Sequence, residues 1–402
     1  MTESLAGTGA TAGSRAAAEA PVVPNFVGGR WISSRAAALG AGKPRARDLG
    51  VPFEGTPGPG NAITDVAGVE VGHTTLISGE GRLEVGKGPV RTGVTAILPR
   101  GKRSNNDAVF AGWFSQNGNG EMTGTTWVEE SGFLEGPFFV TNTHSVGVVR
   151  DAAIAWRVKQ GSPDASGYWW SLPVVAETWD GFLNDINGFH VKTEHVFAAL
   201  SSSAGGAVAE GSVGGGTGMV CYEFKGGIGT SSRRVSEKAG GYTVGVLVQC
   251  NCGSRSQLTV AGVPVGREIP GKVYGEDTGS IIIAVATDAP LLPHQLKRLA
   301  RRATMGLART GSTSGNGSGD IFLAFSTANP GTWAAPRTAG VTMLSNEGMN
   351  PLFEATVQAT EEAIVNAMVA ADTMTGVDGH RADRLPHDAL RAALRKYNRL
   401  RE

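Results

Sequence analysis

The sequence predicts an α+β domain in which layers of strands pack against layers of helices. Short apolar runs rich in valine and isoleucine recur between glycine turns along most of the chain, as expected for the strands of such a domain. Longer segments have the 3.6-residue apolar period of helices and become prominent in the last third. No internal repeat and no second domain is visible, so one large domain of roughly 350 residues is expected.

Several segments have the composition of strands, because they are short, apolar or β-branched, and bounded by turn residues. In chain order they are residues 62–65, 69–73, 92–99, 108–115, 136–142, 242–250, 280–287 and 321–326. The glycine-rich residues 204–218 predict either a long turn region or a helix of small residues that packs tightly.

Helices are expected at four places. Residues 146–159 put Val149, Ala153 and Trp156 on one face. Residues 291–309 have an apolar face beside a row of lysine and arginine, and their proline falls in the first turn, where a helix tolerates it. The other two helices are an alanine-rich segment near residues 351–374 and a last segment near residues 386–400.

The first 47 residues differ in composition from residues 48–402, which form the expected single domain. They are rich in alanine, glycine and serine and predict a mostly disordered extension, in which residues 26–33 are expected to dock as a short arm. They lack the apolar stretch of a secretory signal. No run in the chain approaches the roughly 20 apolar residues of a membrane span, so no membrane partner is expected.

The charge and cysteine content limit which classes of partner and which cellular compartment are expected. Acidic and basic residues balance at 36 each, so no net field attracts nucleic acid or an anionic membrane, and a small-molecule partner is expected. The cysteines are Cys221, Cys250 and Cys252, an odd number that predicts no disulfide framework. Cys250 and Cys252 fall on one face of an expected strand. This pattern favours a reducing compartment and a cytoplasmic location.

The dipeptide Gly279-Ser280 is a candidate site of self-cleavage. A serine at the start of a buried strand, preceded by glycine, has its hydroxyl beside a carbonyl that no side chain shields. If that bond is cut, Ser280 gains an α-amino group with a reference pKa of about 7.7 to 8.0, which is a base tethered to the hydroxyl that it would activate. The alternative is a turn that merely precedes the strand.

Three further segments put polar groups in apolar surroundings. Asn251 ends an apolar strand, where its amide could donate to a developing oxyanion. Ser318 and Asp320 lie two residues apart, so an extended backbone points both to one face, where they could orient an ammonium or a nucleophile. Glu177 follows an apolar run and could hold a substrate's ammonium group. The plainer alternatives are a turn asparagine, a solvated glycine loop and a surface glutamate.

Other kinds of site lack support. The seven histidines form no helical ligand pair, so no metal is expected. No Gly-x-Ser-x-Gly motif indicates a nucleophile elbow, and nothing points to a Ser-His-Asp triad. Residues 211–218 lack the lysine and the strand-then-helix context of a phosphate loop.

Together these segments resemble the DmpA-type family, which comprises the L-aminopeptidase/D-amidase-esterases and the related β-peptidyl aminopeptidases. The resemblance covers about residues 49–378 and leaves out the N-terminal extension. The motifs that carry it, in the family's order, are residues 62–73, 142–147, 245–249 with Asn251, 279–283, 286–296 and 315–320.

The resemblance implies a four-layer αββα sandwich like that of the N-terminal-nucleophile hydrolases, with different strand connectivity. It implies a self-processing hydrolase, cut between Gly279 and Ser280 into an α chain of residues 1–279 and a β chain of residues 280–402. Several two-chain units would form a homo-oligomer. The enzyme would need no metal or cofactor and would release the N-terminal residue from short peptides, amides or esters.

Residue by residue, the resemblance makes Ser280 the nucleophile and, through its new amine, the base. Asn251 matches the oxyanion-hole asparagine, and Glu177 matches the carboxylate that receives the substrate's amino terminus. Ser318 matches the serine near the nucleophile. Asp320 stands where some members have glutamate, so here the same charge is carried on a shorter side chain.

One position departs from the family pattern, and two other functions stay open. Trp179 replaces the tyrosine of Glu-Thr-Tyr-Asp-Gly, and its indole can donate but cannot accept a hydrogen bond or a proton, so rate or substrate preference is expected to differ. Acyl transfer to an amine, as in the similarly folded ornithine acetyltransferases with their threonine nucleophile, is opposed by Ser280 and Glu177. A catalytically silent binding protein of the same fold is favoured by Trp179.

Overall fold

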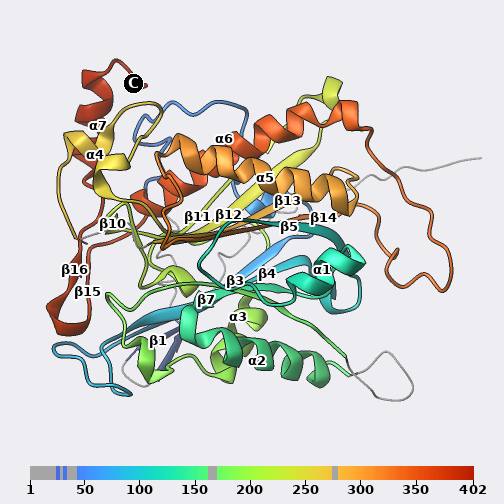
Figure 1. Cartoon of the computed structure of the whole chain (residues 1–402), viewed down its shortest axis with the longest axis horizontal. Coiled ribbons are helices and arrows are strands. Elements are labelled where there is room, and N and C mark those ends of the chain that lie inside the picture. The colour runs from blue at the N-terminus through green and yellow to red at the C-terminus, as the bar shows by residue number, and fades with distance from the viewer. Residues whose placement is uncertain (1–23, 28–29, 34–42, 162–169, 274–278) are drawn as a thin grey trace, which may run out of the picture.

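The computed structural model describes residues 24–27, 30–33, 43–161, 170–273 and 279–402. Two six-stranded sheets pack face to face, and helices cover the outer face of each (Figure 1). The expected four-layer αββα sandwich is therefore confirmed. Among the helices of these residues, none combines the length and the apolar character needed to cross a membrane.

The first sheet lies on helices α2 (Val146–Lys159) and α3 (Thr193–Ser202). Val149 and Leu200 from these helices pack against Val94 and Ala96 of the sheet. In spatial order its strands are β2 (Arg30–Ser33), β1 (Pro24–Val27), β3 (Glu70–Ser78), β4 (Val90–Lys102), β7 (Phe138–Asn142) and β8 (Val174–Thr178).

The second sheet lies under helices α5 (Pro293–Arg309) and α6 (Asn350–Val369). Its strands, in spatial order, are β11 (Gly227–Arg234), β12 (Thr243–Asn251), β13 (Ser280–Thr287), β14 (Gly319–Ser326), β5 (Val109–Gly118) and β6 (Phe133–Leu134). The shorter elements are α1 (Thr125–Ser131), α4 (Val265–Glu268), α7 (His387–Lys396), β9 (Val220–Cys221), β10 (Phe224–Lys225), β15 (Met374–Thr375) and β16 (Arg381–Ala382).

Strand β13 is central to the second sheet and buried on both faces. Ile281 and Ile283 pack in the core under the helices, while Ile282 and Ala284 pack in the core between the two sheets. A strand buried on both faces is apolar throughout instead of alternating, which explains the continuous apolar run after Ser280. The strand is antiparallel to β12 and parallel to β14, so the ends of three strands meet at Ser280.

Most expected elements are present, and the differences have local causes. Residues 62–65 are not a strand, because Asp65 accepts hydrogen bonds from the backbone N–H groups of Gly60 and Ala62 and closes a 3₁₀ turn at Ile63–Asp65. Helix α6 ends at Val369, earlier than expected. Residues 204–218 are a turn region and not a helix of small residues, with one 3₁₀ turn at Gly214–Gly216.

Part of the expected N-terminal extension is ordered on the domain. Strands β1 and β2 form an antiparallel pair, and β1 continues the first sheet beside β3. The docked arm predicted at residues 26–33 is therefore confirmed for Phe26, Val27 and β2. The rest of the extension up to residue 42 lies outside the described residues.

The prediction that the cysteines form no disulfide was wrong. Strands β9 and β10 form a short hairpin that packs on β12. This contact brings Cys221 of β9 next to Cys250 of β12, which lies 29 residues further along the chain, and the structure joins the two in a disulfide. The sequence spacing alone carried no sign of this packing.

Candidate active site

A pocket of about 930 Å³ opens where β13 begins and β8 ends. It brings together Ser280, Glu177 and Trp179, three of the residues singled out from the sequence. Its lining comprises Asn119, Gly120, Glu121, Thr143, Glu177, Trp179, Phe182, Val273, Ser280 and Gly317.

Ser280 is the first residue of β13 and is 6% exposed. Its Oγ accepts a hydrogen bond from the backbone N–H of Gly319, at 3.0 Å. Gly279 directly precedes Ser280, and residues 274–278 lie outside the described residues. A Cβ on Gly279 would lie 2.1 Å from the carbonyl oxygen of Asn251 and 2.4 Å from the Cα of Cys252. Only glycine therefore fits this position without moving the backbone.

Asn251 ends β12 directly opposite Ser280 in the strand register. Its Oδ1 accepts from the backbone N–H of Val220 at 2.7 Å, and its Nδ2 donates to the carbonyl of Trp179 at 2.9 Å. A donor on one side and an acceptor on the other fix the orientation of the amide. Since Nδ2 carries two hydrogens, one N–H is left beyond the bond to Trp179.

Ser318 and Asp320 form a buried hydrogen-bonded pair beside the nucleophile candidate. The Oγ of Ser318 donates to Oδ1 of Asp320 at 2.6 Å. Gly319 lies between them and is the residue whose N–H reaches Ser280. The expectation that both side chains point to one face is therefore confirmed.

Glu177 is a buried carboxylate at the end of β8, with 3% of its surface exposed. Its Oε1 accepts from the backbone N–H of Glu121 at 2.9 Å, and its Oε2 accepts from the hydroxyl of Thr143. Burial raises the pKa of Glu177, and the two hydrogen bonds and nearby His144 act in the opposite direction. A cation that enters the pocket would find this desolvated carboxylate held in a fixed orientation, with Glu121 also in the pocket lining.

Trp179 contributes to the site in two separate ways. Its side chain lies at the pocket and is 40% exposed, with the indole packed closely on Gly181. Its backbone carbonyl holds the amide of Asn251. The contact to Asn251 therefore does not depend on whether the residue is tryptophan or tyrosine.

The sequence reasoning missed several residues of the site. Thr143 lies within the motif at residues 142–147, and that motif could have identified it as a residue of the site. Glu121 and Val220 act through their backbone N–H groups, so the identity of their side chains could not have indicated their roles. Asp180, which follows Trp179 but does not line the pocket, is fully buried and accepts from Nδ2 of Asn184 at 3.0 Å, and burial raises its pKa to about 7.

Among the described residues, the three cysteines are close enough in principle to share a metal ion, with their sulfur atoms within 4.8 Å of one another. Two of them are joined in the disulfide. None of the three lines the pocket.

Proteins named as aminopeptidases match this chain over most of its length. The chain is 57% identical to the β-peptidyl aminopeptidase BapA of Sphingosinicella microcystinivorans, over 94% of this chain and 98% of the relative. A solved β-aminopeptidase of Burkholderia sp. superposes with a TM-score of 0.82 at 49% identity, over 88% of this chain and 99% of that one.

A second solved structure connects the fold to a known class. The L-aminopeptidase D-Ala-esterase/amidase of Ochrobactrum anthropi, described as a prototype of the serine aminopeptidases and a variant of the Ntn hydrolase fold, superposes with a TM-score of 0.83. It is 49% identical, over 89% of this chain and all of that one. The family model of peptidase family S58 matches residues 61–382. Because this match spans most of the chain, the protein belongs to peptidase family S58.

Proposed function

We propose that the protein is a self-processing serine aminopeptidase and amidase. It cuts its own chain between Gly279 and Ser280, and then releases the N-terminal residue of short peptides, amides or esters through an acyl-enzyme on Ser280. The observation that carries this proposal is that Ser280 and the buried carboxylate of Glu177 line one pocket. Membership of a peptidase family supports it.

In the self-cleavage step, Oγ of Ser280 attacks the carbonyl carbon of Gly279. The C–N bond to Ser280 breaks, an ester to Oγ forms, and the departing nitrogen takes up the hydroxyl proton. Water then hydrolyses the ester, which leaves a carboxylate on Gly279 and a free α-amine on Ser280. The tight fit of Gly279 against Asn251 and Cys252 supports this step, because it restricts the backbone of the residue that carries the scissile carbonyl.

In turnover, the new amine of Ser280 takes the proton of its own hydroxyl, and Oγ attacks the carbonyl of the substrate. The remaining N–H of Asn251 donates to the oxyanion. The amine or alcohol of the substrate leaves with a proton, and water releases the acyl group from Oγ. The Ser318–Asp320 pair lies beside Ser280 and would orient its amine and hydroxyl.

Glu177 would restrict the enzyme to the first residue of a substrate. A substrate ammonium bound to this buried carboxylate would place the carbonyl next to it at Ser280. A chain that continues past this residue carries a neutral amide in place of the ammonium and would leave the buried carboxylate without a cation. Two donors already hold the carboxylate, so it needs little reorganisation when the ammonium binds.

We propose a β-amino acid as the preferred N-terminal residue, because the relative with 57% identity and a solved structure with 49% identity are both named for that activity. Release of p-nitroaniline from β-alanine, L-alanine and D-alanine p-nitroanilides tests this directly. The β-alanine derivative should have the highest kcat/KM. A higher value for L-alanine or D-alanine would reverse the preference without affecting the aminopeptidase proposal.

The acyltransferase alternative has its own measurement. With an amine acceptor added, a transferase would shift product from the free acid to the new amide, whereas a hydrolase would keep releasing mostly the free acid. The cytoplasmic location rested on the expected lack of disulfides, and the Cys221–Cys250 bond removes that support. The homo-oligomer of two-chain units stays a prediction. Size measurement of the mature protein in solution checks the oligomer.

A further inference from the structure

The amide of Asn251 depends on a segment that does not itself line the pocket. The backing segment, residues 216–226, contains β9, β10 and the turn between them. Its Val220 N–H donates to Oδ1 of Asn251, and this bond helps to fix the direction of Nδ2. A movement of Val220 would therefore change where the remaining N–H of Asn251 points.

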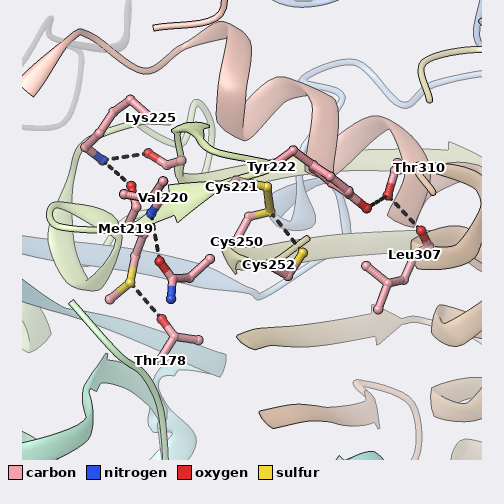
Figure 2. Close-up of a disulfide and its surroundings, with 12 residues drawn as sticks. Thr178, Met219, Val220, Cys221, Tyr222, Lys225, Cys250, Cys252, Leu307 and Thr310 are labelled. Carbon is pink, nitrogen blue, oxygen red and sulfur yellow. Dashed lines mark hydrogen bonds between the residues drawn. A yellow bond between two sulfur atoms is a disulfide. The ribbon is translucent and has the colours of Figure 1, made fainter. Parts of the chain in front are cut away.

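The disulfide is placed next to both ends of this hydrogen bond. Cys221 follows the donor Val220 in the chain, and Cys250 precedes the acceptor Asn251. Figure 2 shows Val220 and Cys221 on the hairpin beside Cys250. The covalent bond thus connects the two backbones within one residue of the polar contact, and all of these residues are buried.

A buried lysine keeps the other end of the backing segment in place. The Nζ of Lys225 donates to the carbonyls of Met219 and Gly226, each at 2.8 Å, and its side chain is fully buried (Figure 2). Met219 is the residue before Val220, and its sulfur accepts from the hydroxyl of Thr178. Val220 is therefore held from both sides, by Lys225 through Met219 and by the disulfide through Cys221.

We propose that Cys221 and Cys250 are positioning residues for the oxyanion donor, because their disulfide holds Val220 against Asn251. The inference rests on the proposed role of Asn251. An oxyanion donor acts by being oriented before the charge develops, and loss of one such donor typically costs about 10²- to 10³-fold in kcat. If the donor is loosened but not removed, kcat should fall by less, about tenfold. Substrate binding at Glu177 should be unchanged.

The test combines a thiol count with kinetics. Alkylation of unfolded, non-reduced wild-type protein should modify Cys252 alone. The variant Cys221→Ala/Cys250→Ala replaces both partners of the disulfide. Cys221→Ala alone would leave the Sγ of Cys250 3.8 Å from the Sγ of Cys252. Measured per cut chain on β-alanine p-nitroanilide, the double variant should lose about tenfold in kcat at unchanged KM. Val149→Ala in α2 is the control, since it removes buried core volume far from the hairpin and should leave kcat unchanged.

A double-variant cycle separates positioning from stability. In an Asn251→Ala background, the two cysteine substitutions should reduce kcat no further, because there is no amide left to orient. If the variant does not fold, mature wild-type protein provides the comparison. Dithiothreitol reduces the protein disulfide and is itself oxidised to a cyclic disulfide. Just enough urea is added for the count of free thiols in the protein to reach three, and the protein is assayed after return to buffer. The same tenfold loss in kcat is expected.

The proposal is overturned if unfolded wild-type protein has three reactive cysteines without reductant, or if breaking the disulfide changes kcat less than twofold. It is also overturned if the cysteine substitutions cost as much in the Asn251→Ala background as in wild type. If wild type is active and Asn251→Ala alone keeps full kcat, the proposed oxyanion role fails first and the positioning role with it. An inactive wild type contradicts the proposed function itself.

Discussion

Asn251 and Ser280 lie directly opposite each other at the ends of the antiparallel strands β12 and β13. A slip of one residue in this register would turn one of the two side chains to the opposite face of the sheet. Both strands are buried on both faces, so such a slip would also turn their core side chains to the wrong faces of the sheet. The geometry of the candidate oxyanion donor and nucleophile is thus set by the packing of the whole second sheet.

Gly279→Ala should slow self-cleavage strongly. The added Cβ would meet the Asn251 carbonyl oxygen at 2.1 Å, so the backbone must shift and the scissile carbonyl must move with it. A loss of at least 100-fold in the rate of chain cutting is expected, measured by intact mass over time. Gly147→Ala is the control, because its Cβ meets nothing within 4 Å and alanine favours the helix α2. Equal cutting rates in the two variants would contradict the expectation.

Glu177→Gln should impair turnover and spare self-cleavage. A charged hydrogen bond to a substrate ammonium contributes about 1.5–3 kcal/mol, so kcat/KM on β-alanine p-nitroanilide should fall roughly 10- to 150-fold. Self-cleavage involves no ammonium and should proceed normally. A variant with wild-type kcat/KM would remove the carboxylate from the proposed binding site.

The acid side of the pH profile should report on Glu177 through KM. Burial raises its pKa, so the carboxylate becomes protonated above the pH range of an ordinary glutamate. As the pH falls through that region, ammonium binding is lost and KM rises. In Glu177→Gln this rise in KM should be absent. Persistence of the same rise in the variant would assign it to another group.

Trp179→Tyr should change substrate preference more than kcat. The contact to Asn251 comes from the backbone carbonyl, which the substitution keeps, whereas the exposed indole lines the pocket. We expect kcat within about threefold of wild type, since no transition-state contact is removed, and altered relative KM values for small and large N-terminal residues. A large fall in kcat with unchanged KM would instead place the side chain in the chemistry.

Asp180→Asn should alter the pH dependence of stability. Burial raises the pKa of Asp180 in the folded protein to about 7, above its unfolded value, so the folded state binds the extra proton between about pH 4 and 7. As the pH rises through that window, wild type therefore loses about 1.4 kcal/mol of its free energy of unfolding per pH unit relative to the variant. Above about pH 7 the difference between the two proteins is constant. Urea unfolding in the uncut Ser280→Ala background measures this, and a difference that does not vary with pH would contradict it.

Much of the fold and of the site was predictable because side chains carried the signal. The apolar run after Ser280 predicted a buried strand, and the spacing of Ser318 and Asp320 predicted a shared face that their hydrogen bond confirms. Helix α2 was predicted with its observed bounds, because its apolar face has a clear helical period.

The parts that could not be predicted depend on backbone partners or on distant packing. The amide of Asn251 is held by the N–H of Val220 and the carbonyl of Trp179, groups that every non-proline residue possesses. The disulfide depends on the packing of a hairpin on β12, and an odd number of cysteines suggested no pairing. At residues 62–65, the hydrogen bonds of Asp65 outweighed an apolar pattern that resembled a strand.

The central claim is that Ser280 is made into an N-terminal nucleophile by a cut after Gly279. The most direct test is the intact mass of purified, active protein under denaturing conditions, beside Ser280→Ala. The account predicts two chains for wild type, ending at Gly279 and beginning at Ser280, and one uncut, inactive chain for the variant. Active wild type that remains a single chain, or normal cutting in Ser280→Ala, would contradict it.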